Sequence, residues 1–471
     1  MTALWTDSSA AKATGGHAIG TWAARGVSID SRSVAPDDLF VAIVGPRLDG
    51  HDFVSTAMQS GAAAALISRR PDNMATDTPS LEVPDTLEAL RALAIAARAR
   101  TEAKIIAVTG SVGKTSTKEA LRLVLENQGK TTASASSFNN HWGVPLSVAR
   151  MPADTDYGVF EVGMNHAGEI EPLSRIIRPH VAIITTIEPA HIEFFDSIEG
   201  IADAKAEIFS GMSGGVAVLN RDNPLFERLA TAAEEAGVDE IIAFGEHTGS
   251  DARLISCTTD RDGSMVKADI AGRQIRYQLS MPGRHFVMNS LAVLGAVNAV
   301  GGDPLAAART LEALAPLDGR GQRFDLALAG GSFTLIDESY NANPASMRAA
   351  FETLAKTRPG PSGRRVVALG EMRELGARSA AYHRELAEEL ESRGIDSVFA
   401  CGTAMTEMFG DLPSAMQGGF ADESEELATA VSNFIQSGDV VVVKGSLASG
   451  MQKVVDALKA LDDTSGARDE G

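Results

Sequence analysis

The clearest pattern in the chain is a short apolar run that ends in a glycine-rich turn and continues into an amphipathic helix. The run Ile105–Val108 is mostly β-branched, which is typical of a strand buried on both faces of a parallel sheet. A turn over Gly110–Gly113 follows, and apolar residues then recur with helical spacing at Leu121, Val124 and Leu125. The pattern therefore predicts a strand, a glycine turn and a helix in direct succession.

Apolar runs and helical stretches alternate through residues 101–317. This alternation predicts a central domain with a mostly parallel sheet. Residues 252–280 alternate apolar and polar positions, which indicates antiparallel strands. A helix is expected to begin near Gly283 and to include Asn289. The further strands expected in this domain are Val159–Val162, Val181–Ile187 and Val216–Leu219.

The flanking segments repeat the alternation on a smaller scale. Residues 1–100 predict a small α/β domain with strands at Leu39–Val44 and Ala62–Ser68 and a helix at Leu87–Arg100. Residues 318–471 predict a Rossmann-like, doubly wound sheet. The whole chain is therefore expected to be α/β with three domains. The elements expected in the third domain are strands at Phe333–Ile336, Val366–Leu369 and Val440–Val443, and helices at Pro344–Lys356, Ala380–Arg393 and Ser449–Ala460.

Composition narrows the class of protein. The 471 residues carry a formal charge of −20, which argues against a general nucleic-acid binder. No apolar run has the length of a membrane span, and the N-terminus has no apolar signal-peptide core. The two cysteines, Cys257 and Cys401, lack metal-ligand spacing, so we expect reduced thiols in a cytoplasmic protein. We expect this protein to be a monomer.

The glycine turn carries the chemistry of a phosphate-binding loop. In TGSVGKTSTK, the backbone N–H groups of Gly110, Ser111, Val112 and Gly113 can surround phosphate oxygens. The general pattern has a further glycine where this chain has Val108, so the loop is a shorter form. A plain glycine turn with a solvated lysine is the structural alternative. The strand and helix around it favour triphosphate binding, with roles for Lys114 on the outer phosphates, Thr115 on Mg²⁺, and the adjoining Ser116.

Three polar residues follow the central strands, at the sheet edge where ligands of α/β proteins bind. Glu161 could complete a Mg²⁺ shell begun by Thr115, and a glutamate in so apolar a run is costly to bury without a partner. The alternative is a strand-edge glutamate in water. His191 and Lys205, each taken alone, would be interpreted as ordinary packed or solvent-facing residues.

Several motifs together resemble the Mur ligase family across nearly the whole chain. Its members have a domain for the UDP end of a precursor, a central ATPase domain and a C-terminal domain for the incoming amino acid or dipeptide. The resemblance is closest to the dipeptide-adding type, because the Asp-Asn-Pro-Arg motif of the diaminopimelate-adding type is absent. The motifs are TGSVGKTSTK, SFNNHWGVPLS, EVGMNHAGEI, AHIEFFDSIEGIADAKAEIF, NRDNP, GRGQRF and DESYNANPAS.

The resemblance implies ATP and two Mg²⁺ ions as cofactors, with UDP-N-acetylmuramoyl-tripeptide and D-alanyl-D-alanine as partners. It places Lys205 where the family carries a carbamylated lysine, which would hold the second Mg²⁺ with His191, while Thr115 and Glu161 hold the first. Asn289 matches the adenine-reading asparagine, Arg323 the arginine at the γ-phosphate and Asp337 the ribose-binding aspartate. Substrate contacts are expected from Asp30, Ser31 and Arg32 at the UDP part, from Asn139, Asn140 and His166 at the peptide, and from Asn341 and Asn343.

The implied reaction is amide formation through an acyl phosphate. Other members of the superfamily, the diaminopimelate-adding ligase and folylpolyglutamate synthase, are alternatives. A nucleotide-controlled switch without ligase activity is a third, although a switch has no need of a carbamate next to His191. The segment around Asn343 also has a purely structural interpretation, as a loop capped into a helix with Pro344 in its first turn.

Overall fold

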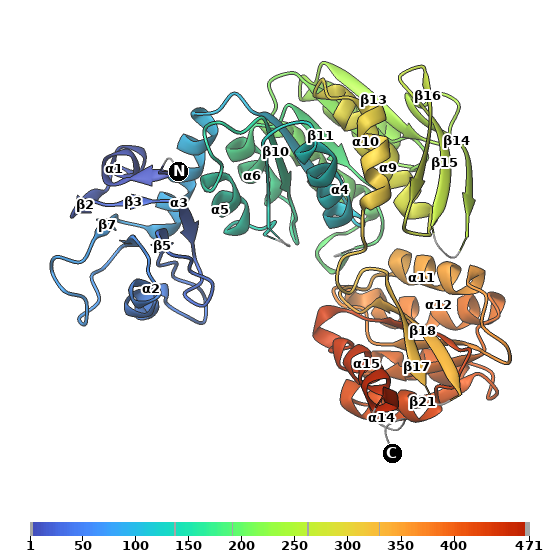
Figure 1. The fold of residues 1–471 in the computed structure, drawn as a ribbon. Coiled ribbons are helices and arrows are strands. Elements are labelled where there is room, and N and C mark those ends of the chain that lie inside the picture. The colour runs from blue at the N-terminus through green and yellow to red at the C-terminus, as the bar shows by residue number, and fades with distance from the viewer. Residues whose placement is uncertain (1–2, 136–137, 191, 261–262, 329, 467–471) are drawn as a thin grey trace.

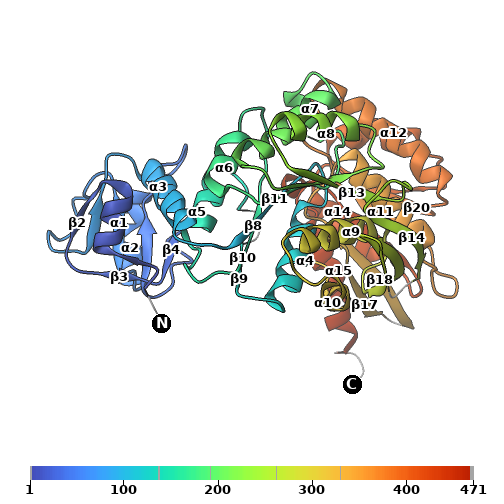
Figure 2. The same cartoon turned by 90° about the horizontal axis from the view of Figure 1, so that it is seen from above.

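The computed structural model describes residues 3–135, 138–190, 192–260, 263–328 and 330–466. Within these residues the chain forms three α/β domains, and the N-terminal and C-terminal domains lie against different sides of the central one (Figure 1). A turned view shows the same separation of the first and third domains (Figure 2). In the described parts of the chain, none of the helices has the length and apolarity that a membrane crossing requires.

The N-terminal domain is built on a sheet with the order β2-β7-β6-β5-β4, parallel except for the β2–β7 pair. The strands expected at 39–44 and 62–68 are present as β5 and β6, and the helix expected at 87–100 is α3. The strands and α-helices of this domain are β1 Trp5–Thr6, α1 Asp7–Thr14, β2 His17–Ile19, β3 Ala23–Ala24, β4 Gly26–Ser28, β5 Asp38–Val41, α2 Val54–Gln59, β6 Ala64–Ile67, β7 Ser80–Glu82 and α3 Thr86–Ala99.

The central sheet has the order β16-β15-β14-β13-β12-β11-β8-β10-β9. It is parallel from β9 to β14 and antiparallel from β14 to β16, as the sequence predicts. The strands are β8 Lys104–Thr109, β9 Thr131–Ala133, β10 Tyr157–Glu161, β11 Val181–Ile184, β12 Val216–Asn220, β13 Glu240–Gly245, β14 Ala252–Thr259, β15 Ser264–Ile270 and β16 Arg273–Leu279. The α-helices are α4 Lys114–Glu126, α5 Gly143–Ala149, α6 Ile170–Ile177, α7 Ile198–Ala206, α8 Phe226–Glu235, α9 Arg284–Ala299 and α10 Pro304–Thr310.

Strand β8 is buried on both faces, which explains its unbroken apolar sequence. Ile106 and Val108 pack into a core with α4 and α9, while Ile105 and Ala107 pack into a core on the opposite face. Because β8 is central and ends in the glycine turn, both cores hold the position of that turn. The expected helix with Leu121, Val124 and Leu125 is confirmed as α4, and all three side chains are buried.

The core on this second face also runs into the N-terminal domain. Trp5 and Leu93 belong to the same buried cluster as Val148 on α5. The Trp5 indole donates to the Ala149 carbonyl at 3.0 Å, and the Arg100 guanidinium lies over the Trp5 ring. The first two domains are therefore joined by a continuous apolar core.

The C-terminal sheet has the order β17-β18-β22-β19-β20-β21 and is parallel except for the β17–β18 hairpin. Helices α11, α12 and α13 cover one face, and α14 and α15 cover the other, so the expected doubly wound arrangement is confirmed. The bounds are β17 Gln322–Leu328, β18 Gly331–Glu338, α11 Pro344–Lys356, β19 Arg365–Leu369, α12 Ser379–Ser392, β20 Ser397–Cys401, α13 Thr406–Asp411, β21 Gln417–Ala421, α14 Ser424–Phe434, β22 Val440–Lys444 and α15 Gln452–Gly466.

Candidate active site

The turn between β8 and α4 has the backbone that a phosphate-binding loop needs. Gly110 and Gly113 have φ values of +144° and +86°. A Cβ on Gly110 would lie 1.9 Å from Thr185 Oγ1, so a larger residue does not fit there. No described side chain caps the first turn of α4. Its N–H groups can therefore bind an anion.

The segment after β11 holds this loop in place. The Ser111 N–H donates to the Thr186 carbonyl at 2.9 Å, and the Ser111 hydroxyl donates to the Glu188 carbonyl at 2.9 Å. The Thr185 hydroxyl donates to the Val112 carbonyl at 2.6 Å. These hydrogen bonds hold Ser111 and Val112 in place, which pre-organises the loop for a ligand.

Four charged side chains meet around the start of α4. Lys114 donates from Nζ to the Gly110 carbonyl at 2.7 Å. Burial lowers the pKa of Lys114, the nearby Glu161 carboxylate acts to raise this pKa, and the Arg320 charge lowers it further. Burial and the Lys114 charge together hold the pKa of Lys205 well below its usual value. The structure therefore brings Lys114, Glu161 and Lys205 together, as the sequence analysis expected.

Glu161 is the carboxylate that fits a metal. It ends β10 and is 1% exposed. Its Oε1 accepts from Asn139 Nδ2 at 2.7 Å, whereas Oε2 is buried without a hydrogen-bond partner among the described residues. An unpaired buried carboxylate oxygen is costly, and a bound cation would remove that cost. Thr115, the other predicted ligand of the first ion, is buried in the first turn of α4.

The second predicted metal site is only partly described. His191 lies outside the described residues. Lys205 is buried near the end of α7, and residues 192–194 form the short 3-10 helix η2, Ile192–Phe194. In the described ranges, no three His, Cys, Asp or Glu side chains are grouped so that they could hold a metal. The ligands predicted here are a threonine hydroxyl, one carboxylate and a modified lysine, so they do not form a cluster of three His, Cys, Asp or Glu side chains.

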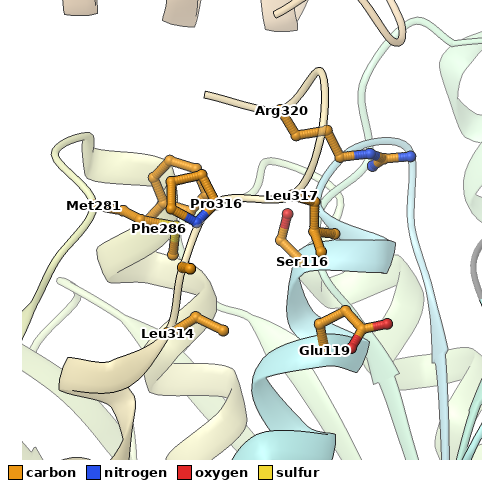
Figure 3. Close-up of a pocket in the computed structure, with 9 residues that line it drawn as sticks. Ser116, Glu119, Met281, Phe286, Leu314, Pro316, Leu317 and Arg320 are labelled. Atoms are coloured by element: carbon orange, nitrogen blue, oxygen red, sulfur yellow. The ribbon is translucent and has the colours of Figure 1, made fainter. Parts of the chain in front are cut away.

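An apolar pocket lies beside the N-terminal end of α4. Asn289 on α9 borders the loop, because a Cβ on Gly113 would lie 2.7 Å from Asn289 Nδ2. Figure 3 shows side chains from α4, from α9 and from the linker before β17 converging here. Asn289 lines a second small pocket that shares Met281 and Phe286 with this one, and both would have to widen to admit a purine base. The lining residues include Ser116, Glu119, Met281, Phe286, Leu314, Pro316, Leu317 and Arg320.

Arg320 lies close enough to the phosphate loop for its charge to act on Lys114. Arg320 extends from the linker toward the N-terminal end of α4 (Figure 3), and its guanidinium lies 4.4 Å from the centre of the Tyr340 ring. Arg323 lies on β17 and donates from Nη2 to Thr357 Oγ1 at 3.3 Å. The motif GRGQRF contains both arginines, but the sequence analysis named only Arg323.

The predicted residues of the C-terminal domain are held by local hydrogen bonds. Asp337 is buried on β18, where its Oδ1 accepts from the Ser339 N–H and hydroxyl. Asn343 caps α11, which confirms the structural interpretation of this segment, with Pro344 in the first turn. Buried Lys444 donates to the Asn341 carbonyl at 3.0 Å and so fixes the loop before that cap.

The remaining substrate candidates lie on separate parts of the surface. Asn140 Oδ1 accepts from Gly143 N at 2.9 Å and so supports the start of α5. His166 is exposed, and its ring packs against Phe194 with centroids 4.3 Å apart. Asp30, Ser31 and Arg32 follow β4 in the N-terminal domain. There the Arg32 guanidinium, hydrogen-bonded at 2.7 Å, lowers the pKa of the Asp30 carboxyl.

Comparisons with known proteins agree with this geometry. The Mur ligase middle domain model matches residues 108–297, the Mur ligase, glutamate ligase domain model matches 319–447, and the Mur ligase family, catalytic domain model matches 24–98. The chain is 35% identical over 431 residues to the UDP-N-acetylmuramoyl-tripeptide–D-alanyl-D-alanine ligase of Rickettsia prowazekii, covering 91% of this chain and 94% of that protein.

Solved structures give the same result at the level of the fold. A crystal structure of MurF from Acinetobacter baumannii superposes with a TM-score of 0.85 and 29% identity, covering 97% of this chain and 99% of that one. The structure of MurF ligase from Thermotoga maritima in complex with ADP superposes with a TM-score of 0.78 and 26% identity, covering 94% of this chain and 98% of that one.

Proposed function

The chain belongs to the Mur ligase family, and from that premise we propose that it joins D-alanyl-D-alanine to a UDP-N-acetylmuramoyl-tripeptide at the expense of ATP, in peptidoglycan precursor synthesis. The proposal is supported by full-length similarity to ligases with that name. It is also supported by the phosphate loop, the adjacent apolar pocket and the buried charges around Lys114.

The reaction proceeds in two displacements. A carboxylate oxygen of the tripeptide attacks the γ-phosphorus of ATP, the bond to the bridging oxygen breaks, and an acyl phosphate and ADP result. The amine of the dipeptide then attacks the acyl carbon. The tetrahedral intermediate collapses, inorganic phosphate leaves with the electron pair of the broken C–O bond, and the amine loses a proton. The protein contributes alignment and charge stabilisation more than covalent chemistry.

The nucleotide roles follow from the placement of the residues. The N–H groups of Gly110, Val112 and Gly113 and the ammonium of Lys114 would bind the β- and γ-phosphates, whereas the Ser111 N–H donates to the Thr186 carbonyl. Asn289 and the apolar pocket would take the adenine, and Asp337 remains our candidate for the ribose. We assign the γ-phosphate contact to Arg320 in preference to Arg323, because the Arg320 charge already acts on Lys114.

The residues around Lys114 fit two Mg²⁺ ions. Thr115 and Glu161 would hold one ion, since Glu161 Oε2 is buried and unpaired among the described residues. Lys205, as a carbamate, would help to hold the other. The neutral amine is the nucleophile that attacks the carbon of CO₂ and then loses a proton, and the lowered pKa of Lys205 favours this neutral form. The ions supply electrostatic stabilisation of the phosphate oxygens.

The observation that carries the proposal is the unpaired oxygen of Glu161 beside a phosphate loop. The decisive experiment measures phosphate release from ATP with the UDP-linked tripeptide, with and without D-alanyl-D-alanine. We expect release to depend on the dipeptide. Stimulation by diaminopimelate or glutamate in its place would assign the chain to another ligase type, and acceptor-independent hydrolysis would favour a switch.

A further inference from the structure

The 3-10 helix η2 joins the central and C-terminal domains. Ile192 packs against the core that underlies α7 and also against the C-terminal core that contains Met372 and Leu375. Phe194, at the other end of η2, packs on His166, which follows β10. A three-residue helix thus touches the C-terminal domain and two segments of the central domain. Its position is set by all three.

The C-terminal domain meets η2 with a strained turn. Glu374 has φ of +62°, an unfavourable conformation for a residue other than glycine, and its carbonyl accepts from the Glu193 N–H at 3.2 Å. Gly376 has φ of +57°, and a Cβ there would lie 2.9 Å from the Cα of Glu193. Strain of this kind persists only where surrounding structure enforces it, and here it forms a contact between two domains.

A buried histidine fixes the base of this turn. His383 on α12 is fully buried, its Nε2 accepts from the Met372 N–H at 2.9 Å, and its Nδ1 donates to the Ser379 carbonyl at 2.8 Å. Both ends of the loop from 372 to 379 are therefore tied to one side chain. The turn is presented to η2 as a rigid feature of the C-terminal domain.

We infer that the Glu374–Gly376 turn is a positioning element, which docks on η2 and holds the C-terminal domain where the acceptor amine can reach the acyl phosphate. The inference rests on the proposed function for its kinetic consequence. Because η2 lies between β11, which borders the phosphate loop, and α7, which carries Lys205, a displaced turn changes the spacing between acceptor and reaction centre. A displacement of about 1 Å is enough to slow such a reaction strongly.

The chain offers a matched pair of substitutions for the test. Gly376→Ala places a methyl group against Glu193, whereas Gly394→Ala makes the same change at φ of +65° with no atom within 4 Å of the new Cβ. Backbone strain is therefore similar in both variants, and only the contact differs. Relative to Gly394→Ala, we expect Gly376→Ala to lower kcat of dipeptide-dependent phosphate release at least tenfold. The Kd for ATP should stay within twofold.

Hydrogen exchange gives a readout that is independent of turnover. The Glu193 amide should exchange faster in Gly376→Ala than in Gly394→Ala, because it loses its carbonyl partner on Glu374. Glu193→Pro removes the same donor without filling space at Gly376, and it should lower kcat to a similar degree. It replaces Gly376→Ala in the comparison if that variant does not fold.

Equal kcat and equal Glu193 exchange in the two alanine variants would overturn the inference. A Gly376→Ala enzyme faster than wild type would also overturn it, since the contact would then restrain the reaction. If the wild-type protein shows no dipeptide-dependent release, the proposed function fails instead, and the exchange comparison still decides whether the turn docks on η2.

Discussion

Individual residues at the start of α4 combine burial with charge in a way that a purely structural site would avoid. Lys205 is buried, and burial together with the nearby Lys114 charge lowers its pKa, while Glu161 keeps one oxygen unpaired among the residues described. Buried charges without full pairing cost stability, so their presence points to a ligand that completes them.

Thr115 is expected to act through the metal and not through the nucleotide itself. Thr115→Ala should weaken binding of Mg·ATP by about tenfold or more and binding of free ATP much less, as titration calorimetry with and without Mg²⁺ would measure. Thr117→Ala is the matched control, because its hydroxyl is also buried on α4 but has no described partner. Equal losses for both forms of ATP would count against a metal ligand at position 115.

Lys205 is expected to be needed for ligation but not for nucleotide binding. Lys205→Ala should leave the Kd for ATP within a few-fold and reduce dipeptide-dependent phosphate release by about 10³-fold or more, as expected for loss of a charged group at the transferring phosphate. Added short carboxylic acids, which can supply the missing oxygen ligands, should restore part of the rate. Near-normal turnover without them would remove Lys205 from the site.

The two arginines of the GRGQRF motif give a direct comparison. Arg320→Ala should lower kcat by about 10²-fold or more, because an arginine at a transferring phosphoryl group has effects of that size or larger. Arg323→Ala should lower kcat much less, since its guanidinium contacts Thr357 in the C-terminal domain. Steady-state kinetics of both variants would decide between them, and the reverse order would restore the assignment suggested by family resemblance.

At the scale of elements, the sequence predicted most of the central and C-terminal strands and helices because their apolar periodicity is strong. Helix α11 begins and ends at the expected residues. Strand β11 ends at Ile184, three residues earlier than the apolar run predicts, because Thr185 and Thr186 turn to bond the phosphate loop. Strands β17, β20 and β21 were not predicted. In β17 the polar residues Gln322 and Arg323 interrupt the pattern, and only its pairing with β18 makes it a strand.

The candidate site was predictable to the extent that motifs define it. The loop, Glu161 and Lys205 were found from sequence and come together in the structure. The position of Arg320 near Lys114 was not predictable, because it depends on the direction of the linker before β17, and the Arg323 assignment stays a prediction. The η2 contact was also hidden, since a strained turn at Glu374 leaves no signature in the sequence.

The loop between β19 and α12 should lose stability in acid through His383. Burial lowers the pKa of His383 in the folded state below 6.5, the value for an unfolded chain. At a pH between the folded-state and unfolded-state pKa values, the unfolded state binds more protons, so the free energy of unfolding falls as the pH decreases through this range. His383→Leu leaves the Met372 N–H unpaired, which should cost about 1–3 kcal/mol at pH 7.5. Urea unfolding followed by circular dichroism should show a smaller cost at pH 5.5; a constant difference would contradict the assignment.

At the scale of the whole molecule, the first two domains share a core and the third has its own. We therefore expect two unfolding transitions. All three tryptophans, Trp5, Trp22 and Trp142, lie in the first two domains, so tryptophan fluorescence should report one transition and circular dichroism both. ATP should shift the fluorescence transition upward, by mass action on the folded state. A single coincident transition by both probes would show that the third domain is not independent.

The continuous core from Trp5 to α5 has a consequence for substrate choice. Because packed interiors resist compression, the gap between the residues after β4 and the phosphate loop is nearly fixed, and a precursor whose UDP end binds after β4, as the family resemblance implies, must span it. The first two domains then act as a ruler: a stem peptide one residue shorter would leave its terminal carboxylate short of the γ-phosphate, however well its nucleotide end is bound.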